Sequence, residues 1–258
     1  MENGEKRKVL DEIFQALRKN NLKSTVLKFD NDLIKRISDS RFRNQFDVTK
    51  CDTPDLLPRS VVNAGYFMVH LGGGEHAFVR GEGYHKFESI KEVKRWKIKD
   101  SILDDISESE AQSASTAFNN KIIHDFLFGK TDIDLMLHTA RRARVSYKFK
   151  VNNEPLKAEA LQIEVDGIYE SSDKQTIATI EVKNKDNSYF EVRQLFSAMK
   201  YCEQKIPKNY QIKLLFLVRI RNKGNDTFDI YEYKFRDKEE LTSIGFVRAI
   251  RYQIEKTK

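Results

Sequence analysis

The sequence predicts an α/β (α+β) fold in which helices flank one mixed β-sheet. In the C-terminal half, segments with helical spacing of apolar residues alternate with β-rich runs, in the order helix, three strands, helix and two strands. The N-terminal part instead combines helical patterns with apolar runs that glycines interrupt. We therefore expect an N-terminal helical and hairpin-containing region in front of a mixed-sheet core.

The N-terminal region is predicted to be helical over residues 5–45. Val9, Ile13 and Leu17 recur near the helical period in its first segment. Residues 60–87 contain short apolar runs broken by glycines, among them a triple glycine, and this pattern is typical of hairpins. We expect hairpin strands there.

An acidic stretch, DDISESE at residues 104–110, has almost no large apolar side chains. It marks the predicted boundary between a domain at 1–103 and a domain at 104–258. In the second domain, the predicted helices cover residues 114–129, 132–143, 188–205 and 241–256, and the predicted strands cover 145–151, 161–170, 176–183, 211–220 and 227–235.

Composition limits the classes of function. No apolar run approaches the roughly 20 residues that span a bilayer, and the N-terminus lacks the apolar region of a signal peptide. The two cysteines are far apart, so we expect neither a disulfide framework nor a zinc site, and a cytoplasmic location. A net charge of +7 favours a polyanionic partner.

Charged residues interrupt two strands that otherwise consist of core residues. In a strand, residues i and i+2 point the same way, so Glu181 and Lys183 share one face of TIATIEVK. In the preceding strand, Glu164 and Asp166 share a face in the same manner. Because ESSDKQ between the strands is a natural hairpin connection, we expect Asp166 to lie beside Glu181 and Lys183.

Two carboxylates and one lysine suit metal-assisted hydrolysis. Paired carboxylates are hard oxygen ligands for Mg²⁺, which also binds phosphate oxygens of a substrate. The metal lowers the pKa of a bound water and offsets charge on the phosphoryl group. An adjacent lysine can position the attacking water. The bland alternative is a cross-strand ion pair on a solvated sheet face.

Asp166, fourteen intervening residues and then Glu181-Val182-Lys183 at the end of an apolar strand resemble the active-site motif of the PD-(D/E)XK nuclease superfamily. The order of helices and strands over roughly residues 110–235 is similar to its core. The resemblance implies a restriction-endonuclease-like mixed β-sheet core. It also implies Mg²⁺-dependent cleavage of DNA. The proline that names the motif is replaced here by valine.

The resemblance also implies roles for individual residues. Asp166 and Glu181 would be metal ligands, the carbonyl of Val182 a third ligand, and Lys183 the catalytic lysine. Gln194 falls where several members have an active-site glutamine. Some members keep a further acidic residue on the helix before the sheet, where this chain has Glu108 and Glu110; a helix-dipole role explains these two equally well.

The tripeptide Glu-x-Lys alone has little specificity, because the chain contains it four times, beginning at Glu92, Glu181, Glu203 and Glu232. We expect the copy at Glu92 to be a charged surface and the copy at Glu203 to end a helix. The copy at Glu232 lies in a predicted strand for which we expect an exposed face. Only Glu181 has both an apolar strand around it and an acidic strand before it.

Two basic stretches are candidates for contact with double-stranded DNA, since lysine and arginine neutralise phosphates. They comprise Lys94, Arg95, Trp96 and Lys97, and Arg141, Arg142 and Arg144. Trp96 could stack on a base, although a lone tryptophan is also explained by packing. A solvated helix face explains the arginines equally well.

The expected function is therefore a Mg²⁺-dependent endonuclease of the type II restriction kind, acting on double-stranded DNA. Cutting both strands of a palindrome calls for two active sites, hence an expected homodimer. A DNA repair or junction-resolving nuclease keeps the chemistry and changes the substrate. A non-catalytic DNA-binding protein is the alternative from another class.

Overall fold

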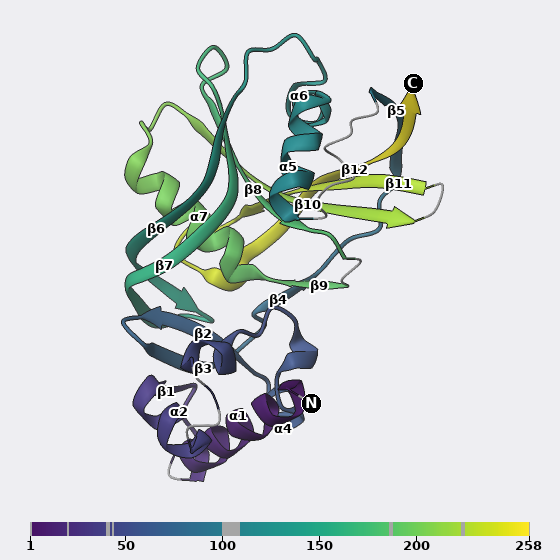
Figure 1. Cartoon of the computed structure of the whole chain (residues 1–258). Helices are drawn as coiled ribbons and strands as arrows, with labels where there is room; N and C mark the ends of the chain where they lie inside the picture. The colour runs from purple at the N-terminus through teal and green to yellow at the C-terminus, as the bar shows by residue number, and fades with distance from the viewer. Residues whose placement is uncertain are drawn as a thin grey trace.

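The computed structural model describes residues 2–19, 21–39, 42, 44–99, 109–185, 188–222 and 225–257. It is an α/β structure in which an N-terminal unit packs under one large curled mixed sheet (Figure 1). Within the described residues, no helix is both long and apolar enough to cross a membrane. Both the mixed sheet and its flanking helices confirm the coarse fold prediction.

The N-terminal unit packs helices against a three-stranded sheet of order β1-β3-β2. Its elements are α1 (Glu2–Lys19), β1 (Val26–Asp30), α2 (Asn31–Ser38), α3 (Gln45–Thr49), η1 (Pro54–Leu56), α4 (Arg59–Asn63), β2 (Tyr66–Gly72) and β3 (Glu75–Arg80). The helical spacing in α1 buries Val9, Ile13 and Phe14 completely. The hairpin predicted around the triple glycine is confirmed by β2 and β3, whereas β1 interrupts the stretch predicted to be helical.

The large sheet has the strand order β5-β12-β11-β10-β8-β7-β6. The β8–β10 and β5–β12 pairs are parallel and the other pairs antiparallel. Its strands are β5 (Glu92–Lys99), β6 (Met136–Val151), β7 (Glu154–Ser171), β8 (Thr176–Lys183), β10 (Gln211–Asn222), β11 (Asn225–Phe235) and β12 (Ile244–Thr257). A short pair, β4 (Tyr84–Lys86) and β9 (Tyr189–Glu191), lies beside it.

Helices cover both faces of the sheet. Helices α5 (Glu110–Asn119) and α6 (Ile122–Phe128) belong to one apolar cluster, and α7 (Val192–Lys205) belongs to the other. Strand β10 separates the two, because Leu215 and Leu217 contact the α5–α6 cluster while Phe216 contacts the α7 cluster. This alternation follows from the two-residue period of a strand that is buried on both sides.

Two predicted helices are wrong, because both segments are strands. Residues 132–143 were predicted to be helical, but Met136–Val151 forms β6, which pairs with β7 along nearly its whole length. Residues 241–256 were also predicted to be helical. After a short 3-10 turn, η3 (Leu241–Ser243), they form β12 between β11 and β5. In both cases pairing within the sheet overrides a local helical preference.

Strands from either side of the predicted domain boundary share one sheet. β5 precedes the acidic stretch and pairs with β12, the last strand of the chain, and β4 pairs with β9. Residues 100–108 lie outside the described part of the chain.

The prediction that the strand at Glu232 has an exposed face is also wrong. β11 is an interior strand, and Glu232 and Asp229 are both buried. Glu232 accepts hydrogen bonds from Lys213 at 2.7 Å and Arg248 at 2.9 Å. Asp229 accepts two from Arg251, at 2.7 and 2.5 Å. Paired charges therefore occupy positions that we predicted to be solvated.

Gly72 allows the N-terminal unit to approach β7 closely. It has φ +89°, and a Cβ atom built there would lie 1.9 Å from the carbonyl oxygen of Glu159. The backbone of β2 thus lies directly on the backbone of β7. The next residue, Gly73, also has a positive φ of +60°, but a Cβ there would meet nothing within 4 Å.

The two glycines give a matched pair of variants. We expect Gly73→Ala to lower the free energy of unfolding by about 1 kcal/mol, the cost of a left-handed alanine. We expect Gly72→Ala to lower it by roughly 2–4 kcal/mol, because backbone atoms must also move apart. Urea unfolding of both variants measures the difference. Equal losses would show that β2 does not depend on this close contact.

Candidate active site

The β7–β8 hairpin brings Asp166 next to Glu181. Its antiparallel ladder ends with Gly167 opposite Ile180, so Asp166 comes opposite Glu181 on the same face. The Oδ2 atom of Asp166 accepts a hydrogen bond of 2.7 Å from the backbone N–H of Val182. The convergence predicted from the sequence is therefore confirmed. The Asp166 carboxylate itself joins the two strands where their ladder ends, away from the turn.

Glu181 is bound by two side chains from different elements. Its Oε1 atom accepts hydrogen bonds from the ammonium of Lys183 at 3.0 Å and from Nε2 of Gln194 at 2.6 Å. Gln194 lies in the first turn of α7, which covers this face of β8. Its Oε1 atom is buried and has no hydrogen-bond partner among the described residues. An acceptor therefore remains available beside the carboxylate.

Lys183 contacts three oxygen-bearing groups at the end of β8. Besides Glu181, its ammonium donates to the carbonyl of Val182 at 3.0 Å and lies 3.2 Å from a carboxylate oxygen of Glu110. Glu110 is the first residue of α5, so this helix reaches the site from the opposite face of the sheet. Glu108 lies outside the described residues.

Burial governs the protonation of these groups. Desolvation raises the pKa of Glu181 to about 8, although Lys183 works against this. Burial also raises the pKa of Asp166, against the lowering effect of the Val182 N–H. Burial alone would lower the pKa of Lys183, but the carboxylates of Glu181 and Glu110 raise it above its usual value. Lys183 is therefore a cation at neutral pH, and Glu181 is close to its titration point.

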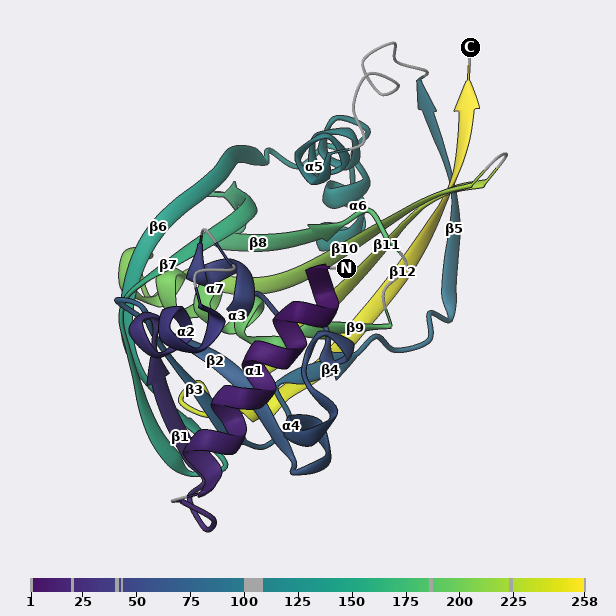
Figure 2. The same ribbon diagram turned by 60° about the horizontal axis from the view of Figure 1, so that its bottom comes forward.

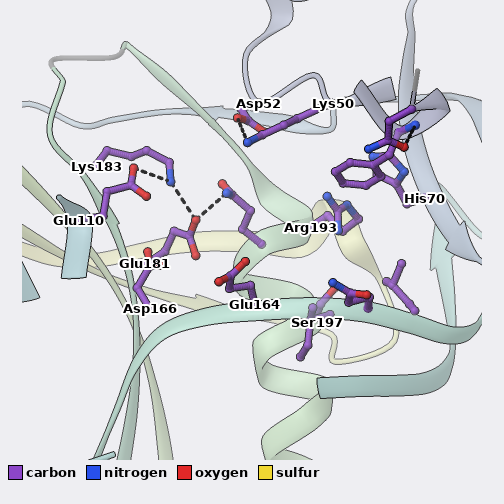
Figure 3. A pocket seen from close by; sticks show the side chains of 16 residues that line it. Lys50, Asp52, His70, Glu110, Glu164, Asp166, Glu181, Lys183, Arg193 and Ser197 are labelled. Carbon is purple, nitrogen blue, oxygen red and sulfur yellow. Dashed lines mark hydrogen bonds and ion pairs between the residues drawn. The ribbon is translucent and has the colours of Figure 1, made fainter. Parts of the chain in front are cut away.

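These residues line one end of a pocket of about 650 Å³ between the sheet and the N-terminal unit. In Figure 3, Glu181 and Lys183 lie toward one side and His70 toward the other, with Arg193 between them. Five acidic side chains line the pocket, against three basic ones: Asp52, Glu110, Glu164, Asp166 and Glu181, and Lys50, Lys183 and Arg193. The pocket is therefore acidic although the whole chain carries a charge of +7.

The donor set at this end of the pocket fits a hard divalent cation. Asp166, Glu181 and the carbonyl of Val182 offer oxygen ligands of the kind that Mg²⁺ prefers, and Gln194 adds an unpartnered amide oxygen. Across the described chain, no group of three or more His, Cys, Asp or Glu side chains is placed to hold a metal ion. Asp166 and Glu181 would supply two carboxylates to such a cation, and the Val182 carbonyl or water would supply further oxygen ligands.

The other copies of Glu-x-Lys lack these surroundings. Glu92 is exposed on the edge strand β5, as expected, and Lys94 beside it pairs with Asp125 at 2.6 Å. Glu203 lies near the end of α7, as expected. Lys234 is exposed on β11. Of the four copies, only the one at Glu181 lines this pocket.

The two basic stretches lie at opposite edges of the sheet, on β5 and β6 (Figure 2). On β5, Trp96 donates a hydrogen bond of 2.8 Å to the carbonyl of Asn120 and packs edge-on against Tyr252. Arg95 and Lys97 are exposed. The Trp96 indole is thus engaged in packing against neighbouring residues, whereas the two flanking cations remain open to solvent.

On β6, Arg142 and Arg144 are exposed on a strand, and the helix expected there does not exist. They lie opposite Glu164 and Gln162, which line the pocket, and Arg142 contacts the Glu164 carboxylate at 3.3 Å. The Arg141 side chain lies outside the described part of the structure. The arginines of β6 therefore flank the same face that carries the pocket.

Sequence reasoning missed the part of the pocket that the N-terminal unit supplies. Phe46, Lys50 and His70 line it, together with Arg193 of α7, whose guanidinium is held by both carboxylate oxygens of Glu191 at 2.7 and 2.9 Å. No sequence signal pointed to Phe46, Lys50 and His70, because they approach the site only through the packing of the N-terminal unit on β7.

Fold and site together define an α/β protein with an acidic pocket at the ends of strands β7 and β8 of a mixed sheet. Residues 79–253 match the family model described as a domain of unknown function, DUF6997, and the chain belongs to this family. Residues 7–78 match a second model, the domain of unknown function DUF6996. Compared with the curated proteins and with the solved structures, the chain has no match.

The pocket is built from both matched segments. Asp166, Glu181 and Lys183 lie in the longer match, whereas Phe46 and His70 lie in the shorter one. The border between the matches falls within β3, earlier in the chain than the predicted boundary at 103/104. The strands β4 and β5 thus fall on the same side of this border as the strands they pair with.

Proposed function

We propose that this protein is a Mg²⁺-dependent endonuclease that hydrolyses phosphodiester bonds of double-stranded DNA, with a PD-(D/E)XK-like site on a restriction-endonuclease-like core. One observation carries the proposal: Asp166, Glu181 and Lys183 converge at a strand end that lines a pocket. A solvated cross-strand ion pair would not need burial, yet the Glu181 side chain is only 12% exposed.

In this proposal, each residue of the site has its own role in catalysis. Asp166, Glu181 and the Val182 carbonyl would hold Mg²⁺, which when bound activates water and offsets charge on a phosphoryl group. Lys183 has a raised pKa, so it acts as a cation that positions water and balances negative charge, and it is not a general base at neutral pH. Gln194 fixes the orientation of the Glu181 carboxylate through its hydrogen bond.

Supercoiled plasmid DNA tests the activity directly. We expect the purified protein to convert it to nicked and linear forms in Mg²⁺ and to leave it intact in EDTA. Because acidic side chains predominate in the pocket, binding of DNA at the site should also need a divalent cation. If the protein binds DNA tightly but leaves every substrate intact in Mg²⁺ or Mn²⁺, the enzyme proposal is wrong and the alternative, a non-catalytic DNA-binding protein, is supported.

Within this activity, we propose a type II restriction role, with a homodimer supplying one site for each strand. Discrete fragments from a long DNA support a fixed recognition sequence, and sedimentation of the DNA complex gives the number of protomers. Cleavage confined to branched or damaged DNA would favour the repair or junction-resolving alternative.

A further inference from the structure

Phe46 presents an aromatic ring to the pocket at the end away from Asp166 and Glu181. It belongs to α3 and is 50% exposed. It lines the same pocket as the two carboxylates. A half-exposed ring that lines a polar pocket offers an apolar face to a ligand, because binding there removes that face from water.

The ring rests on a buried support. Its centroid lies 5.2 Å from that of His70, with the two planes tilted by 33°. The Nδ1 atom of His70 is 3.0 Å from Nδ1 of His76, whose Nε2 is 3.0 Å from Oδ1 of Asn31. His70 and His76 are both buried, so this chain of contacts fixes the His70 ring. The helix is fixed as well, since Asn44 accepts a hydrogen bond from the N–H of Phe46.

The support carries no charge at neutral pH. Burial lowers the pKa of His70 well below its usual value and lowers that of His76 to about 4. A neutral aromatic pair favours a flat apolar ligand over an anion. Lys50, whose side chain is 61% exposed and whose ammonium lies 4.0 Å from the Asp52 carboxylate, also lines the pocket and can meet a second negative charge next to such a ligand.

We propose that Phe46, seated on His70, stacks against one unpaired nucleobase of the DNA strand whose phosphate lies at the Asp166–Glu181–Lys183 end of the pocket. The identity of the ligand rests on the proposed function. A nucleobase has the flat apolar face that the ring requires, and a pocket of about 650 Å³ is large enough for a nucleotide.

The proposal also specifies the state of the substrate. A base inside a duplex is stacked between its neighbours and cannot lay its face against a side chain that lines a pocket. Only an extruded or unpaired nucleotide exposes its face. We therefore infer that the nucleotide next to the phosphate that is cut is turned out of the duplex in the complex, and that a nucleotide already bulged lowers the cost of this step.

Binding measured without cleavage tests this inference. Two labelled duplexes of equal sequence, one fully paired and one with a single bulged thymidine, are titrated in Ca²⁺. We expect wild-type protein to bind the bulged duplex more tightly by about tenfold, the usual value of one base–aromatic stack. We expect Phe46→Ala to bind both duplexes equally. Phe246→Ala is the matched control, because Phe246 is 39% exposed but lies outside the pocket.

A spectroscopic variant checks direct contact. The chain has one tryptophan, so Phe46→Trp adds a second emitter beside His70, and Phe246→Trp adds one elsewhere. We expect the bulged duplex to quench the extra emission of Phe46→Trp and not that of Phe246→Trp. Absence of this quenching at saturating DNA, or a wild-type preference that survives in Phe46→Ala, would overturn the proposal.

The two proposals fail in different ways. If wild-type protein cleaves plasmid in Mg²⁺ but has no preference for bulged DNA, the nuclease stands and the stacking role of Phe46 falls. If the preference depends on Phe46 but no DNA is cut, the stacking site stands and the nuclease falls. If the wild-type protein binds neither duplex, both are wrong.

Discussion

Replacing Lys183 with methionine is expected to reduce Mg²⁺-dependent cleavage by about 10²–10³-fold, the usual effect of removing one preorganised charge from an active site. The side chain is only 19% exposed, and its ammonium contacts Glu181, Val182 and Glu110. Methionine keeps most of the apolar stem and removes the charge. The loss should therefore appear in the rate of cleavage rather than in the fold.

Lys234→Met is the matched control. Lys234 occupies the last position of another Glu-x-Lys sequence on a strand of the same sheet, but it is exposed and lies outside the pocket. We expect this variant to cleave plasmid DNA at the wild-type rate. Affinity for DNA, measured in Ca²⁺ by fluorescence anisotropy, separates lost chemistry from lost binding. A Lys183→Met protein that folds, binds and still cleaves normally would remove Lys183 from the proposed mechanism.

The geometry around Glu181 could be predicted because it is local. Asp166 and Glu181 lie in adjacent strands joined by a short turn, and the two-residue period of a strand decides which residues share a face. A pair of charged residues that share one face of each strand was enough to predict their convergence. The contact between Lys183 and Glu110 was harder to predict from the sequence, because it depends on how α5 is placed against the end of β8.

The two strands predicted as helices show where local patterns fail. In β12, Ile250, Tyr252 and Ile254 alternate on the face that contacts the α5–α6 cluster, and this period was the signal for a strand. Alanine and arginine within the same stretch favour a helix locally. The outcome was decided by β11 and β5, which pair with β12 on both sides and satisfy its backbone.

The far end of the pocket could not be predicted from sequence at all. Phe46 and His70 are distant from Glu181 along the chain, and Gly72 determines how closely their unit approaches β7. Neither residue carries a motif. Their proposed role in binding depends entirely on tertiary packing, and a single sequence contains no register or period that reports it.

Replacing Glu181 with glutamine is expected to stabilise the protein at alkaline pH in the absence of divalent cations. The folded pKa of about 8 lies above the usual value of 4.5, so the folded state binds a proton that the unfolded state releases. Stability contributed by this group is present in full below pH 4.5 and is lost as the pH rises toward 8. The slope is at most about 1.4 kcal/mol per pH unit for one proton.

Glutamine cannot lose that proton, so Glu181→Gln should escape the loss. We expect the variant to match wild type near pH 4.5 and to exceed its free energy of unfolding by roughly 2–4 kcal/mol at pH 8. Urea unfolding in EDTA over this range measures the difference. Glu110→Gln is the control: its carboxylate is 43% exposed and already solvated, so this variant should keep the wild-type fall with pH. A Glu181→Gln curve parallel to that of wild type would contradict the expected protonation.

Mg²⁺ should offset this difference in stability. A cation that binds only the folded state stabilises it by about 2.7 kcal/mol at a concentration of 100 times Kd. Because the ligand is the ionised carboxylate, we expect the Mg²⁺-induced rise in wild-type Tm to grow between pH 6 and 8 and to be small or absent in Glu181→Gln. The cost of ionising a buried Glu181 in the absence of a cation and the gain on binding one then have a single origin, the desolvated position of this side chain at the end of β8. A metal site must bind a cation in preference to a proton, so we expect the folded state to lose stability at this position when no metal is bound.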